Sequence, residues 1–393
     1  MQALHTIGLL CPRGFKFYTY EAVAGMVNYG EEQLNLRLKD LRFQTLSDLE
    51  TLIPKKLENH DCSGLILGLN TNEYTKIKNS LPTDIPRCNI HPDILSPDIP
   101  TVAIDLESLA HKAVDYFNRI GFKNIGLLRS ANTVSQDEVY RHLQLAAAAH
   151  GMDCFQHASE PPENMLSAEE LPTSHALKQW LSELPKPIAI LTSGGFSALI
   201  LSRAAAELNI SIPDELSILS ESDDEACLFT ERPVSSIRSA GPLIGYKALQ
   251  LIHQAILQGE KIQTGRINLP APPIIERSST GLPQGMNQQT KDVIRYIRKN
   301  ALNGISVSSI LSAFPNCSRS KLYREFDKYL GYPPAEEILR LQINKAKELI
   351  AYSSMSVSEI AQMCGFSNQS TFSSTFSRVE GQSPSQWRKS QQH

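Results

Sequence analysis

Catalytic patterns are weak in this chain of 393 residues. Gly194 and Gly195 follow a predicted strand and precede a predicted helix, where free backbone amides can hold a phosphate. Two glycines alone are a weak signal, and no Walker or complete dinucleotide-binding pattern surrounds them. There is no G-x-S-x-G motif, and the ten histidines form no metal-ligand cluster. We therefore expect no catalytic residues, no metal and no cofactor; an enzyme is the competing hypothesis.

The cysteines and the apolar residues indicate a compartment. The seven cysteines are scattered and none forms a C-x-x-C pair, which argues against a disulfide framework and a zinc site. The first residues lack the pattern of a signal peptide, and no window holds eighteen consecutive apolar residues. These features predict a cytoplasmic protein without a membrane partner.

Charge is distributed unevenly along the chain. From Gln289 to His393 there are 14 Lys+Arg and 8 Asp+Glu, a net charge of +6, so the remaining residues hold 24 and 33, a net charge of −9; the sums reproduce the totals of 38 and 41. A basic C-terminal region on an acidic body predicts a polyanion partner for that region.

The same region repeats itself at an offset of fifty residues. SVSSILSAFPNCSRSKLYREFDKYLGYPP begins at Ser306 and SVSEIAQMCGFSNQSTFSSTFSRVEGQSP begins at Ser356, with matched serine, isoleucine, glycine and proline positions and no gap. Each copy reads as a short helix, a tight turn and a longer helix. In the second copy Ser356 and Glu359 have capping-box spacing, and Gly365 supplies the turn.

Aromatic spacing predicts the inner face of the longer helix. Phe372 and Phe376 lie four residues apart in the second copy, and Leu322, Phe326 and Leu330 occupy the matching face in the first. A long helix over 334–353 joins the copies. Two such units can place two reading helices in successive major grooves; a helical bundle that packs on the α/β body is the alternative.

The region from about Gln289 to Lys389 resembles the DNA-binding domain of AraC-type regulators, most specifically in SVSEIAQMCGFSNQSTFSSTFSRVEGQSPSQWRK. The resemblance implies that DNA contacts come from two sets of residues. The first reading helix presents Arg319, Ser320, Lys321, Tyr323 and Arg324, and the second presents Asn368, Gln369, Ser370, Thr371, Ser373, Ser374 and Arg378.

The resemblance also implies roles for some of these residues. Arg324 lies where the family commonly has an arginine that contacts a guanine, and Gln369 can pair with an adenine edge. The serine hydroxyls and Arg378 are expected to contact phosphate. Ser374 and Ser377 stand where the family usually has arginine and lysine, so electrostatic affinity is expected to be concentrated in the first unit.

The first 280 residues alternate predicted strands and helices, which indicates parallel sheets with helices on both faces. Apolar runs predict strands at 5–11, 36–42, 62–69, 100–105, 123–129, 188–193 and 216–220, and helices are predicted around 19–29, 109–119, 137–150 and 197–208. The stretches HTIGLLC, TVAIDLESLAHKAVDYFNRIGFKNIGLL, ISIPDELSIL and PPIIERSST resemble the periplasmic-binding-protein-like sensors of LacI-type regulators. Joined to an AraC-type tail, such a sensor looks most like the xylose-responsive activators of that combined architecture.

The sensor resemblance implies an effector site at the carboxyl ends of the strands, between two lobes. The matching positions are Phe15, Tyr18, Thr19, Glu138, Ser193, Ser222 and Asp223. Several differ from the family pattern: Phe15, Thr19 and Tyr20 replace sugar-clamping residues, Glu138 replaces an arginine, and Ser222 replaces an aspartate, with Asp223 adjacent. These differences argue against xylose itself. A different small molecule is one alternative, and a sensor that has lost its ligand and serves for dimerisation or partner contact is another.

The predicted organisation has three parts. Residues 1–280 form a two-lobed α/β sensor, residues 281–288 a linker, and residues 289–393 an all-α domain with two helix-turn-helix units. We expect a transcription regulator that binds double-stranded DNA, forms a homodimer and contacts RNA polymerase, with a small sugar-like effector.

Overall fold

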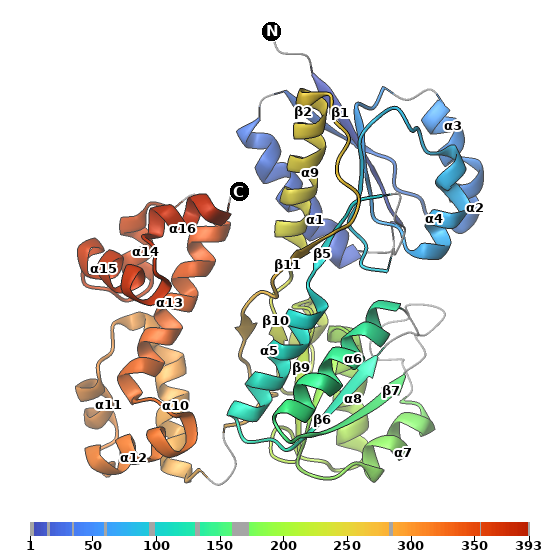
Figure 1. The fold of residues 1–393 in the computed structure, drawn as a ribbon. Coiled ribbons are helices and arrows are strands. Elements are labelled where there is room, and N and C mark those ends of the chain that lie inside the picture. Colours follow the sequence, from blue (N-terminus) through green and yellow to red (C-terminus); the bar gives the residue numbers. More distant parts are fainter. Residues whose placement is uncertain are drawn as a thin grey trace. The chain divides into compact units, whose positions relative to one another are not determined.

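The computed structural model describes residues 4–13, 16–33, 35–58, 61–93, 99–129, 134–158, 173–282, 286–353 and 355–391. The chain divides into two compact regions (Figure 1). The α/β region comprises residues 1–118 and 123–281, and the helical region comprises residues 119–122 and 282–393. Each region is described below by itself.

The first lobe of the α/β region contains a fully parallel sheet in the order β11-β5-β4-β3-β1-β2. Its strands are β1 (His5–Leu10), β2 (Leu36–Asp40), β3 (Gly64–Leu67), β4 (Arg87–Asn89), β5 (Thr101–Ile104) and β11 (Arg266–Leu269). Its helices are α1 (Lys16–Glu32), α2 (Leu46–Thr51), α3 (Ile53–Glu58), α4 (Thr71–Ile77) and α9 (Gly241–Gln258), with the 3-10 turn η1 (Lys78–Ser80).

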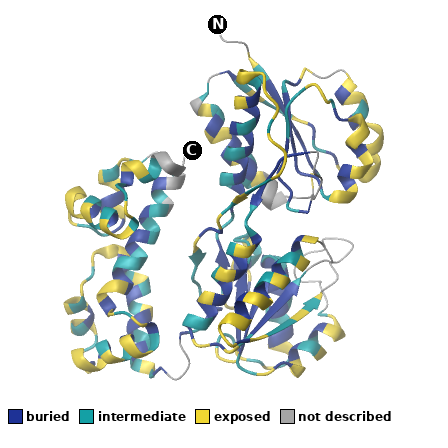
Figure 2. Ribbon diagram, in the orientation of Figure 1, coloured by how far each residue is buried: buried dark blue, intermediate teal, exposed yellow. Residues whose placement is uncertain are grey.

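Alternation along the strands gives this sheet two buried faces. Ile7 and Leu9 pack with α1 and α9, whereas Leu10 packs with α2, α3 and α4 on the other face. The helices α1 and α9 approach each other backbone to backbone, because a Cβ atom on Gly25 or Gly245 would lie 1.8 Å from a carbonyl oxygen of the facing helix. Figure 2 shows the buried strands between partly exposed helices.

The second lobe has the sheet order β12-β10-β9-β8-β6-β7. Its strands are β6 (Asn124–Arg129), β7 (Asp153–Ala158), β8 (Ile188–Thr192), β9 (Leu216–Ser220), β10 (Ser235–Ile237) and β12 (Ile274–Ile275). The helices of this part of the chain are α5 (Leu106–Arg119), α6 (Val134–Ala149), α7 (His175–Glu183) and α8 (Gly195–Glu207), with the 3-10 turn η3 (Glu225–Leu228). The chain passes between the lobes three times, after β5, β10 and β11.

The predicted α/β class is confirmed, with one difference in detail. The sequence predicted parallel strands, but β12 pairs antiparallel with β10, through Ile237 and Ile274. The reason is that β12 follows the third passage between the lobes and enters the sheet from the opposite end. The sequence did not predict the strands β4, β7, β10, β11 and β12, nor the helices α2, α3, α4, α7 and α9.

The helical region contains helices joined by turns, and no strand, among its described residues after Met286. Its elements are α10 (Gln288–Asn300), η4 (Ala301–Asn303), α11 (Val307–Ala313), α12 (Arg319–Leu330), α13 (Pro334–Tyr352), α14 (Val357–Met363), α15 (Gln369–Glu380) and α16 (Pro384–Gln391). Both bounds of α14 and α15 lie fifty residues after those of α11 and α12, as the repeat predicts. Two apolar cores meet along α13, with Ile338 in the first and Ile343, Ala346 and Ile350 in the second.

Candidate nucleic-acid interface and sensor site

The first reading helix, α12, begins at a side-chain cap. The Oγ atom of Ser318 accepts a hydrogen bond from the backbone N–H of Lys321 at 3.3 Å, which satisfies one of the free amides at a helix start. Leu322 and Phe326 are fully buried in the core of the first helix-turn-helix unit. The opposite face is therefore exposed, and it presents Arg319, Ser320, Lys321 and Arg324, with Tyr323 half-buried beside them.

The second reading helix, α15, is built in the same way. Asn368 accepts a hydrogen bond from the N–H of Thr371 at 2.9 Å, and Phe372 and Phe376 are fully buried. The predicted contacts on the other face are exposed, except for half-buried Ser373: Asn368, Gln369, Ser370, Thr371, Ser373, Ser374 and Arg378. Every predicted DNA-contact residue thus lies on, or at the start of, one of the two reading helices, and none is buried.

The two exposed faces differ in chemistry. The face of α12 includes three cationic side chains, and the Arg319 guanidinium lies 5.5 Å from the centre of the Tyr323 ring. On α15, the Ser374 hydroxyl donates to the Thr371 carbonyl at 3.1 Å and the Ser377 hydroxyl donates to the Ser373 carbonyl at 2.7 Å. These hydroxyl protons are engaged by the helix itself, so the serines must rotate before they can donate to a phosphate.

A buried ion pair fixes α13 against α10 in the first helix-turn-helix unit. Glu337 is fully buried and accepts two hydrogen bonds from Arg340, at 2.8 and 3.0 Å, and one from the Tyr332 hydroxyl at 2.8 Å. Arg298 of α10 lies 3.5 Å away. Burial by itself raises the pKa of Glu337, but the hydrogen bonds and positive charges of Arg340 and Arg298 outweigh it and hold the pKa at about 2.

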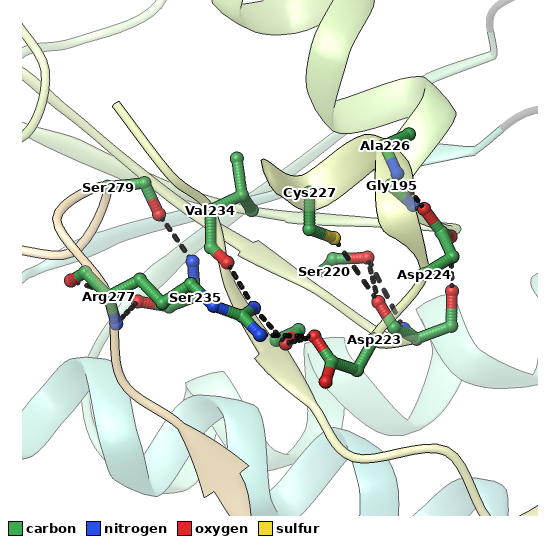
Figure 3. Close-up of polar contacts among 12 residues, drawn as sticks. Gly195, Ser220, Asp223, Asp224, Ala226, Cys227, Val234, Ser235, Arg277 and Ser279 are labelled. Carbon is green, nitrogen blue, oxygen red and sulfur yellow. Dashed lines mark hydrogen bonds and ion pairs between the residues drawn. The ribbon is translucent and has the colours of Figure 1, made fainter. Parts of the chain in front are cut away.

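In the α/β region, the predicted effector residues Ser222 and Asp223 follow β9, and both contact neighbouring side chains. Figure 3 shows Asp223 beside Arg277. Asp223 forms an ion pair with Arg277 at 2.7 Å and accepts a hydrogen bond from Ser236 at 2.6 Å. The Ser222 hydroxyl donates to Asp224 at 3.0 Å. A ligand that bound Asp223 would therefore either displace Arg277 from the carboxylate or bind beside it.

The remaining predicted effector residues lie on other elements. Ser193 follows β8, the strand beside β9, and its hydroxyl is 3.1 Å from that of Ser197. Glu138 on α6 pairs with Arg266 of β11 at 3.3 Å, which joins the second lobe to the first. Phe15 lies outside the described residues, and only the backbone of Tyr18 and Thr19 is described, in the first turn of α1.

The structure adds polar residues at the strand ends that the sequence did not single out. Asp93, after β4, accepts a hydrogen bond from the Ser135 N–H at 2.9 Å and so joins the two lobes. Glu221, directly after β9, accepts from Gln136 at 2.8 Å. Burial raises the pKa of Glu221 to about 7, although the bond from Gln136 lowers it. The sequence signal that could have identified Glu221 is an acidic residue directly after the apolar run LSILS.

Glu21 is a second carboxylate that sequence reasoning missed. It lies on α1, and burial raises its pKa, while the Ser239 side chain opposes the shift and the charge of Asp223 adds to it. Its Oε2 atom is buried, and no described residue hydrogen-bonds it. A buried carboxylate oxygen without a partner is a group that a hydroxyl-bearing ligand can satisfy. Glu21 therefore extends the predicted site from Asp223 to α1.

Other kinds of site were searched within the described residues. No group of three or more His, Cys, Asp or Glu side chains is arranged to hold a metal ion there. All seven cysteines are free thiols, and six of them are buried. None of the described helices has both the length and the apolar character needed to cross a membrane.

Two family models match the chain. Residues 311–390 match the helix-turn-helix domain, and residues 114–280 match the periplasmic binding protein-like domain. The chain therefore combines a helix-turn-helix domain of the AraC type with a periplasmic-binding-protein-like domain, as predicted from the sequence. This combination defines a DNA-binding transcription regulator.

Among characterised proteins, the chain is homologous to the xylose operon regulatory protein of Escherichia coli K12, with 26% identity over 299 residues, which are 74% of each chain. Over 92 residues, 23% of this chain and 37% of the other, it is also similar to the probable transcriptional regulator LumQ of Photobacterium leiognathi, with 38% identity.

Two solved structures share its fold. The xylose-binding transcription activator xylR has a TM-score of 0.58 and 22% identity, and the match covers 99% of this chain and 98% of that one. A LacI family transcriptional regulator from Bifidobacterium animalis has a TM-score of 0.56 and 21% identity, covering 71% of this chain and 98% of that one.

Proposed function

We propose that this regulator binds operator DNA through α12 and α15 and responds to a small sugar-like effector held between its two α/β lobes. The observation that carries the DNA-binding half is geometric: two capped helices at a fifty-residue offset bury their aromatic or leucine face and expose the polar one. The homologue named for the xylose operon supports the effector half.

Roles follow from side-chain chemistry on the two helices. Arg324 reads a guanine through O6 and N7, and Gln369 reads an adenine edge. Arg319, Lys321 and Arg378 contact phosphate, which positions the protein without specifying sequence. A homodimer would raise the effective concentration of the second DNA-binding region once the first is bound. Contact with RNA polymerase, a cytoplasmic location and the absence of catalysis complete the proposal, and the named relatives are likewise regulators.

Selection of duplexes from a random pool by the full chain tests DNA binding. We expect enrichment of sequences with two contacted segments about one helical turn apart. Gel-shift titration with an enriched and a scrambled duplex then measures the preference. Enrichment of no sequence would contradict the proposal. The domain boundary is tested separately: a fragment from Gly285 to His393 should be helical by circular dichroism.

Isothermal titration of the full chain with a panel of pentoses, hexoses and their amino and acid derivatives tests the effector. We expect one compound to bind, and Asp223→Asn and Glu21→Gln to weaken it. The matched control is Asp153→Asn, an exposed acidic position at the start of β7. At a hundredfold excess over its dissociation constant, the compound should add about 2.7 kcal/mol to stability in a thermal shift. No binding by any member would favour the sensor without a ligand.

A further inference from the structure

Two turns of the DNA-binding region touch without a side chain between them. Gly365 lies between α14 and α15, and Gly304 follows η4. A Cβ atom on Gly365 would lie 2.7 Å from the Gly304 nitrogen and 2.7 Å from the Leu302 carbonyl oxygen. A Cβ atom on Gly304 would lie 3.2 Å from the Gly365 carbonyl oxygen. The turn of the second helix-turn-helix unit therefore rests directly on backbone that leads into the first.

Backbone conformation alone does not account for this approach. Gly365 and Gly304 have φ angles of +77° and +69°, which favour glycine. Gly331 and Gly381, which follow α12 and α15, have φ angles of +75° and +73°, yet a Cβ atom on either would meet nothing within 4 Å. The four glycines thus share one conformation, and only two of them share the contact.

The turn η4 is also held from a second side. Gln342 on α13 is buried, and its side-chain amide donates to the Ala301 carbonyl at 3.1 Å. The helix α13 continues into the core of the second unit through Ile343 and Ala346. Within the described residues, the two helix-turn-helix units are therefore joined along α13 and also at the glycine contact. The glycine contact restricts the bending of one unit against the other that a connecting helix alone would permit.

We propose that the contact between Gly365 and Gly304 fixes the distance and angle between α12 and α15, so that both units engage DNA as one rigid reader. The DNA consequence rests on the proposed function. Two helices in successive major grooves must match the helical repeat of the duplex. A rigid pair therefore accepts only one spacing between the two segments it reads, and Gly365 is a positioning residue for specificity.

Pulsed electron paramagnetic resonance tests the rigidity without DNA. Genetically encoded spin-label amino acids replace Asp327 on α12 and Val379 on α15 of the full chain, because both positions are exposed and neither is a predicted DNA contact. We expect one narrow distance distribution in the parent chain, and a broadened or shifted one in Gly365→Ala. Gly304→Ala, with the milder approach, should have a smaller effect.

Gly331→Ala and Gly381→Ala are the matched controls, since they introduce the same backbone strain in open space. Both should leave the distribution narrow. Equal broadening in all four variants would assign the effect to strain, and an unchanged distribution in folded Gly365→Ala would remove the proposal. Circular dichroism establishes folding, and Gly304→Ala provides the test if Gly365→Ala does not fold.

A spacing experiment tests the consequence for DNA. One base pair is inserted between the two segments of a duplex that the full chain has selected, which moves them apart by about 3.4 Å. The parent chain should lose affinity about tenfold or more, whereas Gly365→Ala should bind both spacings within about threefold of each other. Equal sensitivity in the two proteins would contradict the rigid pair. A chain that selects no duplex contradicts the DNA-binding function instead, and the distance measurement still decides rigidity.

Discussion

The two helix-turn-helix units have the same arrangement of helices but are stabilised by different side-chain contacts. Glu337 is fully buried and paired with two arginines, whereas the residue fifty positions later is Trp387, whose ring packs 6.2 Å from that of Phe376. The reading faces differ as well, because α12 is cationic and α15 is rich in hydroxyls. A repeated fold thus allows one copy to specialise in electrostatic affinity and the other in neutral contacts.

The largest expected difference between the units concerns the buried ion pair. Glu337→Ala leaves Arg340 and Arg298 without their carboxylate, which should cost about 3–5 kcal/mol of local stability. Glu380→Ala in the second unit removes the partner of Lys347, a partly exposed pair at 2.9 Å, and should cost about 1 kcal/mol or less. Hydrogen exchange of peptides from α10 and α15 measures both. Similar losses would mean that the two units do not differ in this way.

Acid should separate the units next. The pKa of Glu337 is held at about 2, below its usual 4.5, so its contribution is complete above pH about 4.5 and is lost as pH falls toward 2. We expect the first unit to lose about 3 kcal/mol over that window, at about 1.4 kcal/mol per pKa unit. Hydrogen exchange of α10 peptides at pH 5 and pH 2.5 checks this, with Glu337→Gln as the control that should lack the dependence.

Base recognition should differ by a smaller amount. Arg324→Ala should weaken binding to the selected duplex by about 1–3 kcal/mol and relax preference at one base pair, as expected for a lost bidentate guanine contact. Gln369→Ala should relax preference at a different base pair. Competition gel shifts with single-base-pair variants locate both positions. If Arg324→Ala weakens all duplexes equally, Arg324 contacts phosphate rather than a base.

Salt dependence should show the smallest effect and the sharpest contrast. Each neutralised phosphate contributes about 0.9 to the slope of log affinity against log salt. Replacing Arg319 and Lys321 by glutamine should therefore flatten that slope by up to about two units. Gln369→Ala carries no charge change and should leave it unaltered. Binding titrations of both proteins between 50 and 200 mM salt, about the range in which such slopes are measured, provide the comparison; equal slopes would contradict a division of labour between α12 and α15.

The sequence by itself determined the elements whose signal is local. Serine caps, turn glycines and four-residue aromatic spacing placed α11, α12, α14 and α15, because each of these depends on residues within one or two turns. The long apolar runs likewise placed β1, β3, β6, β8 and β9. The same periodicity predicted which face of α15 is exposed, since burying Phe372 and Phe376 exposes the opposite side. That the exposed residues contact DNA is implied by the resemblance to AraC-type regulators and stays a prediction.

Only the tertiary structure decided features that join residues far apart in the chain. The strands β4, β10 and β12 have three residues or fewer, and β7 and β11 are partly exposed at a sheet edge, so their patterns are too short or too polar to recognise. The helix α9 belongs to the first lobe because the chain returns there after β10. Arg277 reaches Asp223, and Gly365 reaches Gly304, across more than fifty residues. Such contacts leave no periodic signal, because they depend on where the backbone closes rather than on any neighbouring residue.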